Sequence, residues 1–370
     1  MSLPQFDLAL PRRGPAPVPT IEYLEGGTWP LIRRHLLNVG LMILTLGLYR
    51  FWAITVMRQI LWRRIRFAGQ PLEYTGTGIE IFLGFLRVFL IILLPLGIIF
   101  VLIELALERE LPTANADAIE FIDLAYFVIV LVLIEMGRFL SWRYRISRTR
   151  WRGIRGRIEL PASRYLLVAA GAAAMIVFSG WFLKPVVDLY RAQSVIGALN
   201  IGGLRGRYRG GVWNLIGIWI AIWLGFGLLA IGGAFVWISV IGIAVAANSE
   251  VTFGVGAALV GLAAFWVGLF MFSIYRVAFW RHVCLMSDLG PARARFTGGA
   301  VGLTWLTFGN WLILICSLGL LAPVTWERKI RYISRYVVVT GVPDPADLRQ
   351  VGDDDSAIGG EGLAGDFDLA

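Results

Sequence analysis

Charged side chains within long apolar stretches offer the clearest chemistry in this sequence. Arg87, Glu135, Arg138 and Arg276 are such residues. Burying an ionisable group in hydrocarbon is costly, so these residues point to ion pairs, a polar pathway or a gate. We expect Arg87 and Glu135 to pair at similar depth in neighbouring helices, with Arg138 on the same helix face as Glu135. The alternative is structural: the arginines reach lipid headgroups and Glu135 is merely neutralised.

Signals for catalysis or metal binding are sparse. His35 and His282 are the two histidines, and neither lies near cysteines or carboxylates at zinc-site spacing. Cys284 and Cys316 cannot form a disulfide framework. The sequence contains no phosphate-binding P-loop and no nucleophile-elbow motif. We therefore expect no metal, no cofactor and no enzymatic activity.

The elements that carry these residues have the composition of a membrane protein. Of 370 residues, 58% are hydrophobic and 16% are charged, and the mean hydropathy is +0.72. Soluble domains are nearer 25% charged. No apolar run precedes residue 34, so we expect no cleavable signal peptide. The apolar segments are 36–48, 81–103, 118–142, 165–183, 212–247, 252–275 and 300–323. We expect a multi-pass protein of the bacterial inner membrane.

The arginines between these segments disfavour seven alternating spans. Cytoplasmic loops collect arginine and lysine, yet alternation would export either 143–164, with eight arginines, or the basic residues of 184–209 and 281–295. Segment 36–48 also covers only about 20 Å as a helix, against a hydrocarbon core near 30 Å. We predict four spanning helices in two hairpins, three re-entrant or interfacial broken helices at 36–48, 165–183 and 300–323, and cytoplasmic termini. Seven spans is the alternative.

The three broken segments share a motif. Thr45-Leu-Gly47, Ser179-Gly-Trp181 and Ser317-Leu-Gly319 are spaced by 134 and 138 residues. The residues of this break motif are Asn38, Thr45, Gly47, Ser179, Pro185, Asn310, Ser317, Gly319 and Pro323. The common offsets predict an internal repeat. Irregular backbone in a bilayer must be covered by protein or line a wet cavity, so we expect the three segments to pack around a pseudo-threefold centre.

The repeat predicts how the chain is divided. Two whole units occupy 20–152 and 153–291, and a truncated third occupies 292–343. A disordered segment, 1–19, precedes them, and an acidic disordered tail, 344–370, follows. Short strands are expected at 21–25, 71–75, 154–159, 204–209, 292–297 and 335–340. They would form small cytoplasmic β elements beneath the membrane.

Several motifs resemble those of the YjgN-like family of uncharacterised bacterial inner-membrane proteins. They include Thr45-Leu-Gly-Leu-Tyr49 with Trp52, Phe67-x-Gly-x-Pro-Leu-Glu-Tyr74, Arg148-Thr-Arg-Trp-Arg-Gly153 and Asn310-x6-Ser317-Leu-Gly-Leu320. The family's proline and tryptophan after the break appear here as Phe51-Trp52, Pro185-Val186 and Pro323-Val324. The resemblance implies a polytopic inner-membrane protein. It implies no established activity and transfers no catalytic residue.

Basic clusters beside the apolar segments point to lipids. Tryptophan and tyrosine lie among the arginines, a mixture that nucleic-acid binding also uses. Because each cluster abuts a membrane segment, we expect anionic lipids as partners and no nucleic acid. The headgroup candidates are Arg63, Arg64, Arg66, Arg150, Arg152, Arg205 and Arg207.

Three classes of function are compatible with these features. Channel- or permease-like transport of a small solute or ion is favoured by broken helices, which often line transport sites. Binding of anionic lipids or organisation of the membrane, without catalysis, is the alternative. A lipid-modifying enzyme has the least support, with Glu135, Asp188 and Glu327 as its candidate residues. The sequence leaves the substrate, the oligomeric state and the biochemical activity open.

Overall fold

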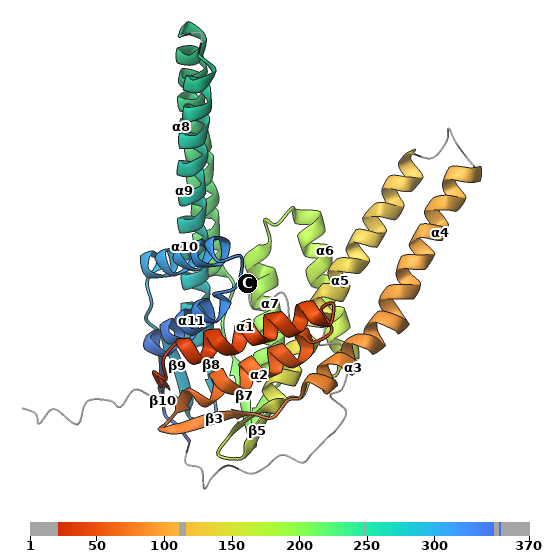
Figure 1. Ribbon diagram of the computed structural model, residues 1–370, viewed down its shortest axis with the longest axis vertical. Helices are drawn as coiled ribbons and strands as arrows, with labels where there is room; N and C mark the ends of the chain where they lie inside the picture. The colour runs from red at the N-terminus through yellow and green to blue at the C-terminus, as the bar shows by residue number, and fades with distance from the viewer. Residues whose placement is uncertain (1–20, 111–115, 248, 344–347, 349–370) are drawn as a thin grey trace, which may run out of the picture.

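Helices dominate the fold and come in pairs. The computed structural model describes residues 21–110, 116–247, 249–343 and 348. The helices are α1 (Trp29–Leu44), α2 (Arg50–Arg63), α3 (Gly78–Val88), the π-helical turn η1 (Phe89–Leu93), α4 (Leu94–Glu110), α5 (Ala116–Arg148), α6 (Ala162–Ser179), α7 (Lys184–Gly197), α8 (Trp213–Ala246), α9 (Glu250–Met286), α10 (Ala300–Cys316) and α11 (Ala322–Tyr336). In Figure 1, two long pairs, α3–α5 and α8–α9, extend away from the β-structure, and α1–α2, α6–α7 and α10–α11 are shorter.

Short strands connect the helix pairs. They are β1 (Ile21–Tyr23), β2 (Ile65–Phe67), β3 (Gln70–Tyr74), β4 (Thr149–Trp151), β5 (Ile154–Ile158), β6 (Leu199–Ile201), β7 (Leu204–Tyr208), β8 (Ser287–Leu289), β9 (Ala292–Phe296) and β10 (Val337–Thr340). Within the described residues they form one ten-stranded sheet in chain order. The first and last strands come into contact, so the sheet curls into a nearly closed strand ring.

Tight turns hold the hairpins of the strand ring. Ala68 and Gly69, with φ of 48° and 77°, form the turn between β2 and β3, and Arg152 and Gly153, with φ of 52° and 80°, form the turn between β4 and β5. Two consecutive positive φ angles characterise the two-residue turn whose twist matches antiparallel strands. The register then places Arg150 opposite Arg155 and Trp151 opposite Ile154. Since side chains alternate along a strand, apolar residues face the inside of the ring and arginines face outward.

Five helices are long and apolar enough to cross a membrane, within the part of the chain that the structure describes. They are Gly78–Ala106, which combines α3, η1 and part of α4, Glu120–Arg148 of α5, and all of α6, α8 and α9. The shorter α10 is also apolar. Both ends of every helix pair join strands of one sheet, so each pair leaves the strand ring and returns to it. The chain is therefore built as a membrane-embedded protein.

In each short pair, one side-chain hydroxyl forms hydrogen bonds to both helices at the break between them. Thr45 Oγ1 donates to the Leu41 carbonyl at 2.7 Å and accepts from the Tyr49 amide at 3.0 Å. The same two bonds join Ser179 to the Met175 carbonyl and the Leu183 amide, and Ser317 to the Ile313 carbonyl and the Leu321 amide. One side chain thus satisfies groups at the end of one helix and the start of the next. The break needs no water for these groups.

The six predicted strands all occur, as β1, β3, β5, β7, β9 and β10. Four further strands, β2, β4, β6 and β8, were not predicted; they have three residues each and begin within two residues of the end of a helix. The prediction of a pseudo-threefold centre is wrong. The α1 helix packs against α11, whereas α6–α7 packs against α5 and α8, because a long pair lies on each side of α6–α7 in the strand ring. The predicted unit boundaries at 152/153 and 291/292 fall at or beside hairpin turns of the ring.

Candidate functional site

A charged cavity of about 510 Å³ lies between α5, α7 and α9. Its ionisable residues are Glu135, Arg138, Lys184, Asp188, Arg191 and Arg276, and Tyr165, Tyr275, Phe272 and Trp280 add aromatic wall. We call this site the polar cavity. Its walls come from the first long pair, the middle short pair and the second long pair.

Glu135 joins two helices through ion pairs with two arginines. Its Oε1 lies 2.8 Å from Arg138 Nη1 of the same helix and 2.8 Å from Arg191 Nη2 of α7. The Glu135 side chain is only 7% exposed. A buried carboxylate is tolerated when it is paired and hydrogen-bonded, and the two guanidinium groups provide that pairing. The contact fixes α7 against α5.

Asp188 performs the corresponding role between α7 and α9. Its Oδ2 lies 2.7 Å from Lys184 Nζ and accepts the Tyr275 hydroxyl hydrogen at 2.7 Å, while Oδ1 accepts from Arg191 at 3.4 Å. Lys184 also lies over the Tyr275 ring, 5.4 Å from its centroid. Arg191 therefore touches both carboxylates of the cavity. This network links all three walls.

Arg276 is different from the other cations of the cavity. Its guanidinium lies over the rings of Trp280 and Phe272, at 5.0 and 5.6 Å from their centroids. Among the described residues, no ion pair within 4 Å involves Arg276. A guanidinium stacked on aromatic rings keeps its N–H edge for planar acceptors. The four cations of the cavity exceed its two carboxylates, so the site favours an anion.

The structure brings together three of the four predicted intramembrane residues. Glu135, Arg138 and Arg276 line the polar cavity. The predicted pairing of Arg87 with Glu135 is wrong: Arg87 is exposed on α3, and the ion pairs of Glu135 are with Arg138 and Arg191. Depth alone does not select the partner of Glu135; α7 places Arg191 against this part of α5.

Most of the α7 contribution is not predicted from the sequence. Lys184 and Arg191 belong to a basic stretch of ordinary composition, and Asp188 is a candidate only for lipid-modifying chemistry. Their spacing offered a signal, since Lys184 and Asp188 are four residues apart and Asp188 and Arg191 are three apart. Such residues share one helix face. Nothing in the local sequence indicates Tyr275 as a partner.

The break motif is structural where the contacts can be described. Besides the three hydroxyls, Pro185 and Pro323 are fully buried in the first turns of α7 and α11, where a missing amide hydrogen costs nothing. Gly47 and Gly319 have φ of 90° and 83° in two of the breaks. Asn38 and Asn310 are buried, and their side-chain amides have no hydrogen-bond partner among the described residues.

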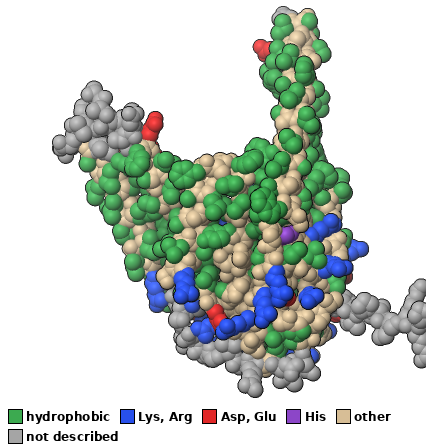
Figure 2. Space-filling view, turned by 180° about the vertical axis from the view of Figure 1, so that it is seen from behind, with side chains coloured by type: hydrophobic (Ala, Val, Ile, Leu, Met, Phe, Trp, Pro, Cys, Tyr) green, Lys and Arg blue, Asp and Glu red, His purple; other side chains and the backbone are tan. Residues whose placement is uncertain are grey.

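The predicted headgroup arginines fall into two groups. Arg64 is tied internally: it donates to the Tyr23 hydroxyl at 3.4 Å and to the Gly27 carbonyl at 3.0 Å, and it lies 3.7 Å from Glu327. Burial raises the pKa of Tyr23, which keeps this phenol neutral beside Glu327. The other six candidates lie on the outer face, in a turn, or at the end of α2: Arg63, Arg66, Arg150, Arg152, Arg205 and Arg207. Figure 2 shows the basic side chains gathered at this end, below the apolar helices.

Metal ligation has no support in the described part of the chain, where no group of three or more histidine, cysteine, aspartate or glutamate residues could hold an ion. A family model described as a bacterial protein of unknown function (DUF898) matches residues 25–365. This match is consistent with the resemblance to the YjgN-like family. No curated protein and no solved structure matches the chain.

Proposed function

Because this chain belongs to the DUF898 family of bacterial proteins of unknown function, we propose its function from its own geometry: it binds the headgroup of an anionic lipid in the polar cavity, at the inner membrane. The observation that carries the proposal is the excess of cations in that cavity, with Arg276 stacked on Trp280 and outside every ion pair of the described residues. A phosphate group would accept hydrogen bonds from such a guanidinium. The role is binding without catalysis.

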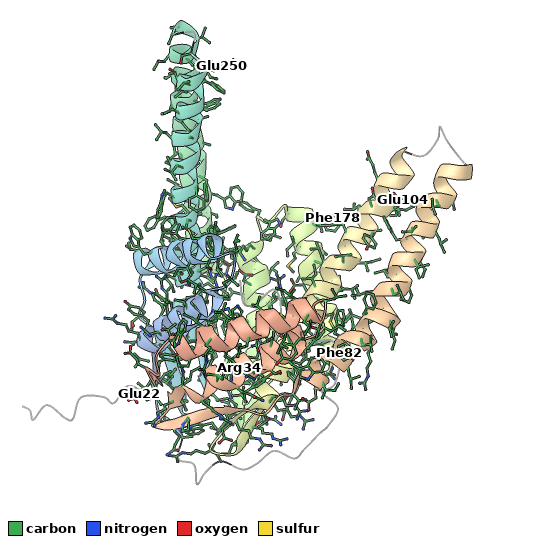
Figure 3. The ribbon with its side chains drawn as sticks, in the orientation of Figure 1. Glu22, Arg34, Phe82, Glu104, Phe178 and Glu250 are labelled. Carbon is green, nitrogen blue, oxygen red and sulfur yellow. The ribbon has the colours of Figure 1, made fainter. Side chains whose placement is uncertain are left out.

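Charge at the two ends of the molecule supports an orientation with the strand ring in the cytoplasm. Basic residues gather at the ring (Figure 2), whereas Glu250 and Glu104 lie toward the far ends of the long pairs (Figure 3). Arginine-rich segments remain on the cytoplasmic side of bacterial membranes. Ile21 and Val337 begin strands of the ring, so both chain ends would be cytoplasmic.

The return of each helix pair to one sheet favours four spans over seven. In this proposal α3–α4, α5, α8 and α9 cross the membrane, and α1–α2, α6–α7 and α10–α11 are re-entrant. The tips of the short pairs are strongly apolar: Leu46, Phe178 and Leu318 are 94%, 90% and 91% exposed. Such side chains are stable there when hydrocarbon surrounds them. Although α6 has the length of a span, the 14-residue α7 that brings the chain back covers only about 21 Å.

Labelling of single cysteines tests this arrangement. After Cys284 and Cys316 are replaced, we expect a membrane-impermeant maleimide to label Glu250→Cys from outside intact cells. We expect Arg150→Cys to react only after the cells are opened, because it lies on the strand ring. Outside labelling of Arg150→Cys would contradict the proposed orientation. Outside labelling of Leu46→Cys would show that α1–α2 crosses the membrane.

Lipid binding is tested by neutralising Arg276. We expect Arg276→Gln to weaken binding of short-chain phosphatidylglycerol to the purified protein about tenfold, since one charged hydrogen bond contributes about 1.5 kcal/mol. The matched control is Arg87→Gln, which removes an arginine from an apolar helix outside the cavity and should leave the affinity unchanged. Equal affinity for phosphatidylcholine, or equal losses in both variants, would contradict the proposal.

Transport of a small solute or ion is the second candidate. It is favoured by the position of the polar cavity between two pairs of membrane-spanning length. Proteoliposomes loaded with potassium chloride distinguish the candidates. Ion efflux that depends on Glu135 and Arg276 would favour transport, whereas saturable phosphatidylglycerol binding without efflux would favour the lipid site.

A further inference from the structure

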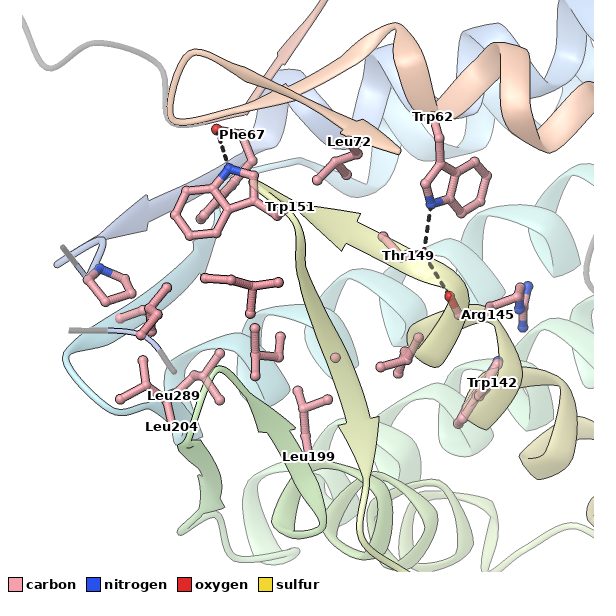
Figure 4. A pocket seen from close by; sticks show the side chains of 17 residues that line it. Trp62, Phe67, Leu72, Trp142, Arg145, Thr149, Trp151, Leu199, Leu204 and Leu289 are labelled. Carbon is pink, nitrogen blue, oxygen red and sulfur yellow. Dashed lines mark hydrogen bonds between the residues drawn. The ribbon is translucent and has the colours of Figure 1, made fainter. Parts of the chain in front are cut away.

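The strand ring encloses a second cavity of about 580 Å³. Its wall includes Phe67 of β2, Trp151 of β4, Ile201 of β6, Leu204 of β7 and Leu289 of β8 (Figure 4). We call it the apolar hollow. Cavities of this volume are typical of sites for small molecules, and the mouths of β-barrels are a common place for them. The hollow is separate from the intramembrane network described above.

Three polar groups in the wall of the hollow, the Trp62 and Trp151 N–H groups and the Thr149 hydroxyl, already have hydrogen-bond partners in the wall. Trp62 Nε1 donates to Thr149 Oγ1 at 3.0 Å, and Thr149 Oγ1 donates to the Arg145 carbonyl at 2.7 Å. Trp151 Nε1 donates to the Phe67 carbonyl at 3.0 Å. Figure 4 shows these bonds as dashed lines between the lining residues. A ligand that bonded to these three groups would have to break the existing bonds, whereas a hydrocarbon ligand would leave them intact.

An aliphatic group of the chain itself occupies one part of the hollow. Leu348 is 9% exposed and lines the cavity beside Pro343. A Cβ added to Gly202 would lie 3.0 Å from Leu348 Cβ, so the two residues are in close contact. The volume of the hollow remains with Leu348 in place. The lining therefore accepts aliphatic carbon and has space for more.

We propose that the apolar hollow is a binding site for a single aliphatic chain of the fatty-acyl type. Burial of methylene groups supplies the affinity, at about 0.8 kcal/mol for each one removed from water. Large apolar cavities exclude water and take up apolar ligands. The bound acyl chain belongs either to a free fatty acid or to a membrane lipid. Both ligands present the same hydrocarbon to Leu204 and Leu289.

This site goes beyond the proposed headgroup function and can fail independently of it. Trp142 lines both the polar cavity and the apolar hollow, yet the hollow contains none of the residues that pair with Glu135 or Asp188. Phosphatidylglycerol binding that depends on Arg276 would survive the loss of the hollow. Acyl-chain binding in the ring would likewise survive Arg276→Gln.

Photocrosslinking tests the proposal. The full chain, in nanodiscs of phosphatidylcholine, is illuminated with a palmitic acid that carries a diazirine near the end of its chain, and mass spectrometry locates the products. We expect crosslinks on β6 and β7, including Ile201 and Leu204. Excess unlabelled palmitic acid should remove them if the site takes a free fatty acid. If only excess phosphatidylglycerol removes the crosslinks, the bound acyl chain belongs to a membrane lipid.

A filled hollow provides the matched comparison. Ala292→Phe places a ring inside the hollow and should abolish the crosslinks on β6 and β7. Arg293→Phe places the same ring on the next residue of β9, whose side chain is exposed on the opposite face and outside the lining, and should retain them. Crosslinks confined to α8 and α9, or equal crosslinking of the ring in both variants, would overturn the proposal. The competition in the unaltered protein decides the question even if Ala292→Phe does not fold.

Discussion

The polar cavity and the apolar hollow have similar volumes, about 510 and 580 Å³, and share Trp142. They differ in whether the polar groups of their walls have partners. In the hollow, the Trp62 and Trp151 N–H groups and the Thr149 hydroxyl are bonded within the wall. In the polar cavity, Arg276 lies on aromatic rings with its charge uncompensated by any ion pair of the described residues. Cavity size alone therefore does not define a ligand; the state of the polar groups does.

The positions of the two sites explain this difference. The polar cavity lies where α5, α7 and α9 meet, and its charges hold these helices together across a gap that apolar contacts do not fill. The hollow lies within paired strands, whose backbone hydrogen bonds are made in the ladder. Its wall can therefore consist of apolar side chains. Ion pairs therefore position the walls of the polar cavity, and the paired strands position the wall of the hollow.

Removing the central carboxylate should have the largest effect. We expect Glu135→Gln to lower the free energy of unfolding by about 3 kcal/mol, because Arg138 and Arg191 would keep their charges near a buried amide. Thermal unfolding of the purified protein measures the loss. Glu250→Gln, in an exposed helix tip, should leave stability nearly unchanged. Equal stability of both variants would show that the polar cavity does not hold the helices.

The corresponding substitution in the hollow should have a smaller effect. We expect Thr149→Val to cost about 1 to 2 kcal/mol, because the Trp62 N–H loses its acceptor while no charge is stranded. Unfolding in denaturant provides the measurement, with the exposed Thr340→Val as the control. Phosphatidylglycerol binding should remain at the level of the unaltered protein. If Thr149→Val lowers the free energy of unfolding more than Glu135→Gln does, the hollow contributes more to stability than the polar cavity, which contradicts this expectation.

The six predicted strands were accessible from the sequence because each presents a local signal. The Ile154–Ile158 strand, for example, alternates apolar residues or glycine with arginine. The missed strands provide only three residues and begin within two residues of the end of a helix, as Thr149–Trp151 does after α5. They become strands through pairing with the next segment after a tight turn. Their conformation depends on a partner as much as on their own composition.

The candidate site was predictable only in part, for a similar reason. Glu135 and Arg138 attract notice as charges in an apolar helix and lie three residues apart. The second partner of Glu135, Arg191, is distant in sequence and lies in a segment with ordinary basic composition. The choice of Arg191 over Arg87 follows from which helices the strand ring places next to α5. No local pattern carries that information.

Composition, and spacing within a few residues, predict the apolar helices, the arginine-rich end, the hydroxyl at each of three breaks and the alternation within the predicted strands. The arrangement of the helix pairs around one ring, the contact of Asp188 with Tyr275 and the enclosure of a hollow by apolar strand faces appear only in the folded chain. Such contacts join residues far apart in the chain, and the geometry of the closed sheet selects them from many partners with equal local chemistry.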